Sequence, residues 1–110
     1  MFTPRFETLK GDQEIANGVF LFETLGHTAG HYSLMVKLKN RRPMLFAADA
    51  CYSQQNLDLM CIQAGNHDPA VARGSLQRLK DLAEKHDAEL FFSHDAASWP
   101  KYLRAPGSYS

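Results

Sequence analysis

Short apolar runs separated by polar turns dominate the first half of the chain. Residues 18–24 read GVFLFET, and residues 31–38 read HYSLMVKL, with apolar side chains at every second position. Such alternation is typical of a β-strand. The polar loop 39–43, KNRRP, separates this stretch from the apolar run 44–49, MLFAAD, at a distance that suits a β-hairpin. We therefore expect three consecutive strands, the last of which ends at Asp49.

A helical pattern follows in the second half of the chain. Asp68 can cap the first free amides of a helix, and Pro69 has the backbone angle that favours the first helical position. From there to about His86, apolar residues recur three and four positions apart, which predicts an amphipathic helix that covers the sheet. The apolar face of this helix is formed by Ala72, Leu76, Leu79, Leu82 and Ala83.

A long connection, a last strand and a tail complete the chain. Residues 50–67 read as an irregular connection that is longer than most loops, which favours a functional role for it. Residues 88–92, AELFF, predict a short buried strand. The tail 96–110 contains two prolines and a glycine and is expected to be mostly irregular.

Length and charge limit the classes of function. A chain of 110 residues is one small domain or a piece of a larger one. It has 12 basic and 12 acidic residues without a basic stripe, which disfavours a nucleic-acid-binding protein. No apolar stretch approaches the roughly 20 residues that span a bilayer, and the N-terminus lacks the apolar centre of a signal peptide. We expect a cytoplasmic protein that contacts no membrane and acts on a small molecule.

The two cysteines are expected to be reduced and packed. Cys51 and Cys61 lie ten positions apart and form no CxxC pair. Because Cys51 is close to Asp49, it could also be a metal ligand or nucleophile, but no partner histidine lies within local reach in the sequence.

Polar groups that bind metals stand at three strand ends. His27 follows the first expected strand, Asp49 ends the third and His94 follows the last. Imidazole and carboxylate are ligands of Zn²⁺ and its neighbours in the first transition row. Gly26 and Gly30 would let the backbone turn sharply, so that His27 points toward a metal. The alternative is that His27 is a surface or capping residue and Asp49 a turn former.

Other arrangements of these groups are less consistent with the pattern. A Ser93–His94–Asp95 relay would need neighbouring residues of an extended chain to converge, although they point to opposite sides. A helical zinc pair of His27 and His31 would place Thr-Ala-Gly inside a helix, which is unfavourable. We expect His31 to be structural, with its ring helping to fix the turn.

Three motifs together resemble a known family. The segments TLGHTAGHYSLMV, LFAADACY and LFFSHD, in this order and spacing, resemble the C-terminal half of metallo-β-lactamase-fold hydrolases. Within that superfamily, the segment DACY, the following DPAVARGSLQRLKDLAE and a trailing tryptophan are similar to N-acyl homoserine lactone lactonases. The resemblance covers nearly the whole chain.

The resemblance implies a fold, two metals and a reaction. The family is an αββα sandwich, of which this chain would be one half: a mainly antiparallel or mixed sheet with one long covering helix. In the family, His27 and His94 would each bind one of two zinc ions, and Asp49 would bridge both. A metal-bound hydroxide would open a lactone or ester. Tyr52, three residues after Asp49, matches a lactonase tyrosine near the substrate carbonyl, although it is equally interpreted as an aromatic packed over the mouth of the site.

One family motif is absent. The signature His-x-His-x-Asp-His, which supplies four metal ligands, does not occur in the 110 residues. We therefore expect residues 1–110 to be a single domain that lacks the N-terminal half, binds zinc partially or not at all, and is catalytically incompetent alone. An acylglutathione thioesterase and a non-catalytic oligomeric fragment are the alternative functions.

A missing half would leave one sheet face uncovered. We expect a homodimer through this face, because an open apolar face of several hundred Å² favours self-association. The candidate residues of the open face are Phe20, Phe22, Leu34, Leu45 and Phe46.

Overall fold

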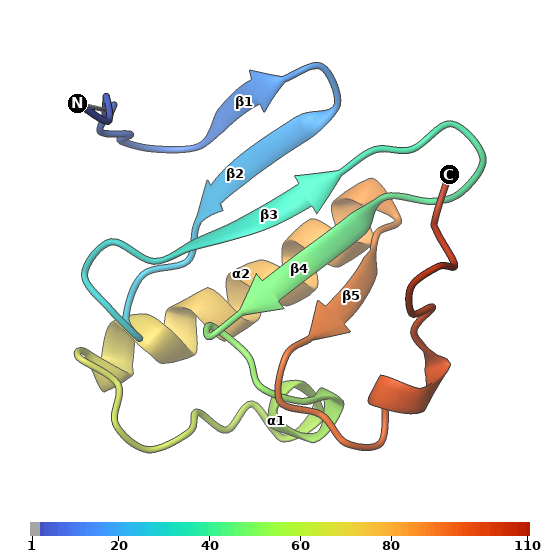
Figure 1. Cartoon of the computed structure of the whole chain (residues 1–110). Helices are drawn as coiled ribbons and strands as arrows, with labels where there is room; N and C mark the ends of the chain where they lie inside the picture. Colours follow the sequence, from blue (N-terminus) through green and yellow to red (C-terminus); the bar gives the residue numbers. More distant parts are fainter. Residues whose placement is uncertain (1–2) are drawn as a thin grey trace.

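A computed structural model of the chain describes residues 3–110 as one twisted sheet with helices on one face (Figure 1). The five strands lie in the sheet in chain order and are antiparallel, except for the last pair, which is parallel. This mixed sheet with one long helix agrees with the expected architecture. The strands are β1 (Gln13–Ala16), β2 (Val19–Glu23), β3 (Tyr32–Val36), β4 (Met44–Ala48) and β5 (Glu89–Phe92); the helices are α1 (Gln54–Leu59), α2 (Pro69–His86) and a 3-10 turn, Trp99–Lys101.

Strand direction determines where the functional groups meet. Strand β3 is antiparallel to both β2 and β4, and β5 is parallel to β4. Strands β2, β4 and β5 therefore run the same way, and their carboxyl ends lie at one edge of the sheet. The residues that follow these three strands are brought to this edge from distant parts of the sequence.

Helix α2 covers one face of the sheet, as its sequence pattern predicts. The Asp68 side chain accepts a hydrogen bond from the backbone N–H of Val71, and Asp87 ends the helix in a left-handed conformation. Leu76 and Leu79 are fully buried and belong to the same core as Met35 and Leu45 of the sheet. Neither helix of residues 3–110 is long and apolar enough to cross a lipid bilayer.

The sequence pattern missed two elements. All four residues of β1 are exposed, so no apolar alternation marks this edge strand. Helix α1 lies within the stretch expected to be irregular, and its hydroxyl cap, Ser53, accepts from the N–H of Asn56. Leu57 is the one buried residue of α1, which leaves no helical period to detect.

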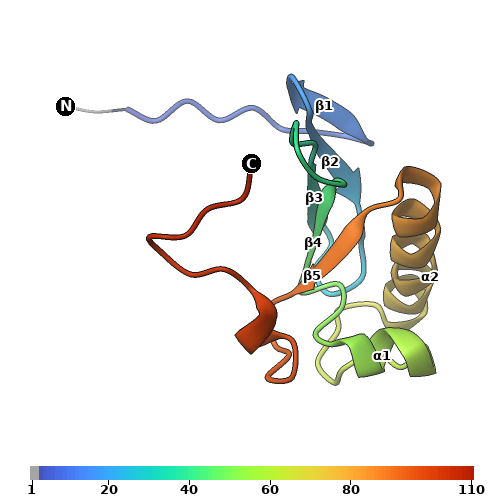
Figure 2. The same cartoon turned by 90° about the vertical axis from the view of Figure 1, so that its right-hand side faces the viewer.

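The expected open face was only partly correct. Leu45 and Phe22 are buried in the core that α2 covers, with 0% and 8% of their surface exposed, and Phe20 packs against that core. Leu34 and Phe46 are paired across β3 and β4, and they stand next to the pair formed by Met35 and Leu45. Because side chains alternate along a strand, Leu34 and Phe46 project from the other face. Figure 2 shows both helices on one side of the sheet and the C-terminal segment on the other.

The prediction for the two cysteines was half correct. Both thiols are free, and Cys51 is buried. Cys61, however, is exposed, because the loop after α1 lies at the surface.

Gly26 lets the β2–β3 loop pack closely against the start of α2. Gly26 has a φ of +122°, and a β-carbon there would lie 2.3 Å from the backbone nitrogen of Ala72. The loop and the helix are also bonded directly, since the N–H of Asp68 donates to the carbonyl of Gly26 over 2.9 Å. Gly30 has no such requirement, because a β-carbon at that position would have no neighbouring atom within 4 Å.

Replacing Gly26 should therefore disrupt the fold, whereas replacing Gly30 should not. We expect Gly26→Ala to lower the free energy of unfolding by about 3 kcal/mol or more, because backbone strain and a clash with the helix add together. The matched control, Gly30→Ala, should stay within about 0.5 kcal/mol of the original chain. Urea unfolding followed by circular dichroism measures both; equal losses would contradict this account.

Candidate metal centre

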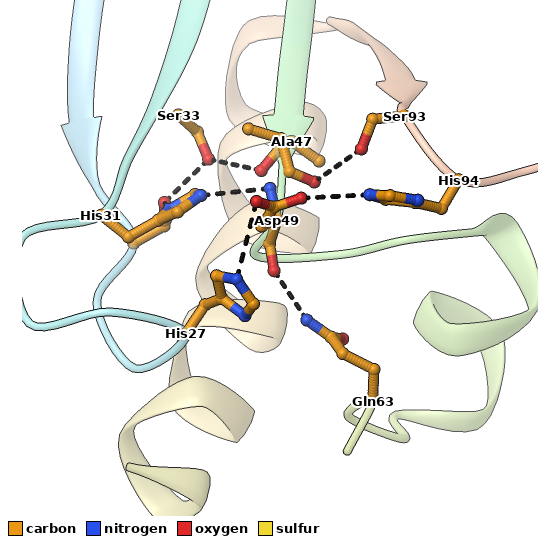
Figure 3. A network of polar contacts seen from close by, with 10 residues as sticks. His27, His31, Ser33, Ala47, Asp49, Gln63, Ser93 and His94 are labelled. Carbon is orange, nitrogen blue, oxygen red and sulfur yellow. Dashed lines mark hydrogen bonds and ion pairs between the residues drawn. The ribbon is translucent and has the colours of Figure 1, made fainter. Parts of the chain in front are cut away.

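Asp49 lies between two imidazoles at the carboxyl edge of the sheet (Figure 3). The Nε2 atom of His27 lies 3.5 Å from Asp49 Oδ2, and the Nε2 atom of His94 lies 3.2 Å from Asp49 Oδ1. Each imidazole therefore faces a different oxygen of one carboxylate. The side chains of Asp49 and His94 are 44% and 52% exposed, so the site is open to solvent.

The backbone around Asp49 is held by side chains from three separate segments. The N–H of Asp49 donates to Nε2 of His31 over 3.1 Å, and the side-chain amide of Gln63 donates to the carbonyl of Asp49 over 2.7 Å. The hydroxyl of Ser93 donates to the carbonyl of Ala48 over 3.3 Å. Ala48 itself has a φ of +49°, which is unusual for a residue with a β-carbon. These bonds hold the turn that takes Asp49 out of the line of β4.

Aromatic contacts orient the two imidazoles that face Asp49. The Tyr52 ring lies 4.1 Å from the His94 ring and 6.2 Å from the His27 ring, between ring centroids. The His31 ring meets the His27 ring edge-on at 6.1 Å. Among the described residues, Nδ1 of His27 is buried without a hydrogen-bond partner, so ring packing and the contact of Nε2 with Asp49 position this imidazole.

The donor set fits two metal positions of two donors each. Nitrogen and oxygen atoms that each lie 2.0–2.2 Å from one tetrahedral Zn²⁺ are about 3.3–3.5 Å apart, close to the two distances at Asp49. No lysine or arginine of residues 3–110 pairs with this carboxylate. Within the same residues, no three histidine, cysteine, aspartate or glutamate side chains surround one point. The residues present can thus hold part of a metal centre, with a carboxylate shared between two positions.

Curated relatives of the chain are lactonases. It is 37% identical to an N-acyl homoserine lactonase of a Bacillus species over 90 residues, which are 82% of this chain and 36% of that protein. It is 34% identical to the N-acyl homoserine lactonase AttM of Rhizobium radiobacter over 87 residues, 79% of this chain and 33% of that protein. The chain thus spans about a third of the length of the relatives it matches. No protein-family model matches it.

Solved structures extend this similarity to the fold. An N-acyl homoserine lactone hydrolase with the product N-hexanoyl-L-homoserine at its catalytic metal centre superposes with a TM-score of 0.83 and 31% identity, over 90% of this chain and 39% of that one. The chain is part of a metallo-β-lactamase fold, and it resembles N-acyl homoserine lactonases. AidC, a dizinc quorum-quenching lactonase, shares the fold with a TM-score of 0.63 and 24% identity, over 86% of this chain and 33% of that one.

The alternative serine relay does not form in this part of the metallo-β-lactamase fold. Ser93 donates to the Ala48 carbonyl, and His94 faces Asp49. Asp95 accepts from the hydroxyl of Ser98, which lowers the pKa of the Asp95 carboxyl, and it also accepts from the N–H of Gln54. Burial raises the pKa of the Cys51 thiol to about 11, which disfavours a nucleophilic role.

Sequence reasoning missed the residues that hold the Asp49 backbone. Gln63 lies in a segment without periodicity, and no local signal indicates its bond to Asp49. The sequence suggested Ser93 only as part of a relay. His31 was expected to fix the turn, and its Nδ1 atom does contact the hydroxyl of Thr24 over 2.9 Å. Its bond to the Asp49 amide spans 18 residues and is a product of strand pairing.

Acid should weaken the fold through His31. Burial lowers the pKa of His31 from its ordinary value of 6.5, so the folded chain binds fewer protons than the unfolded chain. The contribution of the neutral His31 ring to the free energy of unfolding is complete above pH 6.5. It is lost as the pH falls through the lower pKa that His31 has in the folded chain. We expect His31→Gln, which cannot titrate, to show a shallower loss of unfolding free energy as the pH falls below 6.5. Urea unfolding at several pH values measures this, and parallel profiles would contradict it.

Proposed function

We propose that this chain supplies part of the dinuclear zinc centre of a lactone-opening hydrolase. The observation that carries the proposal is the pair of imidazoles, His27 and His94, that face opposite oxygens of Asp49. The similarity to N-acyl homoserine lactonases indicates the substrate class, a lactone with an acyl side chain.

Each residue has a distinct task in this proposal. His27 and His94 would each bind one zinc ion through Nε2, and the Asp49 carboxylate would hold both ions at a fixed separation. Bound zinc would supply an activated water and charge stabilisation for attack on the lactone carbonyl. The phenol of Tyr52, whose ring lies against His94, would donate a hydrogen bond to the carbonyl oxygen.

The remaining ligands would come from polypeptide outside these 110 residues. The described residues give each metal position two donors, and a catalytic zinc site needs about three protein ligands. The His-x-His-x-Asp-His signature is also absent from the sequence. We therefore propose weak zinc binding and no lactone turnover by this chain alone. The free state of Cys51 and Cys61 supports the cytoplasm as the proposed location.

Zinc binding by single variants tests this proposal. We expect the chain to bind zinc, and His27→Ala, Asp49→Ala and His94→Ala each to weaken binding by about tenfold or more, because each removes a donor. Asp49→Ala should have the largest effect, since both positions lose an oxygen. Isothermal titration calorimetry with zinc in a non-chelating buffer measures the affinity.

His67→Ala is the matched control, because the His67 side chain is exposed and its bond to the His27 carbonyl comes from the backbone N–H, which alanine keeps. This variant should leave zinc affinity unchanged. Zinc affinity that is unchanged in all three site variants would overturn the metal assignment. N-hexanoyl homoserine lactone and an acylglutathione, each followed by pH-stat, provide the activity arm. Opening of the lactone by this chain without further polypeptide would contradict the proposed need for it. Cleavage of the thioester but not of the lactone would overturn the proposed substrate class.

We also propose that the chain forms a homodimer through the sheet face opposite α2. Leu34, Val36 and Phe46 are only partly buried there, and the C-terminal segment packs against Phe91 with Tyr102 and Tyr109. The face over β3 therefore keeps apolar surface that a second copy can cover.

A charge on this face should separate the dimer. We expect sedimentation equilibrium to give a dimer for the original chain, and Leu34→Lys to weaken association by about tenfold or more, since a charge would be buried. Leu59→Lys is the control: Leu59 is 63% exposed on α1, on the other side of the sheet, and should not change association. A folded monomer at micromolar concentration would rule out the dimer.

A further inference from the structure

The turn at Ala48 and Asp49 is a strained segment with unusually complete side-chain support. A left-handed residue with a β-carbon costs about 1 kcal/mol or more, so surrounding contacts must hold it in place. Ser93, His31 and Gln63 bond three successive polar groups of this segment: the Ala48 carbonyl, the Asp49 amide and the Asp49 carbonyl. Figure 3 shows these bonds around the carboxylate that faces the two imidazoles.

The hydrogen bond that His31 accepts from Asp49 also determines where the proton of the His31 ring lies. A backbone N–H can only donate, so Nε2 of His31 must accept from Asp49 with its lone pair. The proton of the neutral ring is therefore on Nδ1, from which it donates to the Thr24 hydroxyl over 2.9 Å. The opposite tautomer would place two N–H groups against each other at Asp49.

The chain of hydrogen bonds returns to the strand from which it started. The Ser33 hydroxyl donates to the Ala47 carbonyl over 3.2 Å, so the Thr24 hydroxyl donates to the Ser33 oxygen over 2.8 Å. Thr24 and Ser33 are fully buried, with 0% of their surface exposed. Every proton in the series has one acceptor, and the series joins Ala47 to Asp49 through three side chains.

We propose that His31 is a positioning residue for Asp49: its neutral ring, with the proton on Nδ1, holds the Asp49 amide and so aims the carboxylate between His27 and His94. The role of the carboxylate as a metal ligand rests on the proposed function, whereas the proton arrangement of His31 does not. His31 acts through the backbone of Asp49 and has no part in binding the metal itself.

The first test reads the tautomer in the unmodified, metal-free chain. Long-range ¹H–¹⁵N spectra at pH 8 should show His31 with a protonated Nδ1 and an unprotonated, accepting Nε2. The amide proton of Asp49 should exchange with solvent at least about tenfold more slowly than expected for an exposed turn. A protonated Nε2, or a freely exchanging Asp49 amide, would overturn the proposal.

The second test compares two amide replacements that differ by one methylene. In His31→Gln, the side-chain oxygen can reach the position of Nε2 and accept from the Asp49 amide. In His31→Asn, the amide reaches only the position of Nδ1, near Thr24. We expect the Gln variant to keep the slow Asp49 exchange and the Asn variant to lose it by about tenfold or more. Equal exchange in two folded variants would indicate a purely structural role and overturn the proposal.

Zinc affinity separates this inference from the proposed function. If both hold, His31→Asn should bind zinc about tenfold more weakly than His31→Gln, because groups that orient metal ligands typically contribute a factor of 10–100. If replacing His27, Asp49 or His94 leaves zinc affinity unchanged, the proposed function fails. The tautomer and exchange measurements then still decide the role of His31. Equal zinc affinity of the two variants, where the original chain does bind zinc through Asp49, would count against His31 as a positioning residue.

Discussion

The left-handed turn at Ala48 is the constraint on which the site depends. A strand that continued past β4 would carry Asp49 along its own line, whereas the turn brings its carboxylate between the β2–β3 loop and the end of β5. The conformation is unfavourable for alanine, and hydrogen bonds of the backbone with His31, Gln63 and Ser93 offset its cost. Three segments must therefore be in place before the carboxylate can face both imidazoles.

The same edge of the sheet is tied to the helical layer. The start of α2 bonds to the carbonyl of Gly26, and the hydroxyl of Ser75 donates to the carbonyl of Leu25 over 2.6 Å. The loop that carries His27 is thus held by the helix on one side and by strand pairing on the other. This explains how a small sheet can orient an imidazole whose Nδ1 has no hydrogen-bond partner among the described residues.

The two oxygens of the Asp49 carboxylate face two different imidazoles, those of His27 and His94. In the proposed function this carboxylate would be shared by two metal positions, each with two donors among the described residues. The N-acyl homoserine lactonase of the Bacillus species is about three times as long as the region that matches this chain.

The sequence by itself determined β2, β3, β4, β5 and α2, and it indicated His27, Asp49 and His94 as groups at strand ends. These elements have strong local signals: period-two alternation, a capped helix start and polar residues directly after apolar runs. It did not reveal β1 or α1, because an exposed edge strand and a helix with one buried residue have no such period. Only the tertiary structure decided which strand face is covered, where Phe22 and Leu45 lie, and how His31 and Gln63 reach the backbone of Asp49. Alternation along a strand separates two faces without saying which one a helix will cover. The His31 bond spans 18 residues and forms only when β3 and β4 have paired, and the Gln63 bond spans 14 residues and forms only when the loop after α1 has packed against the end of β4.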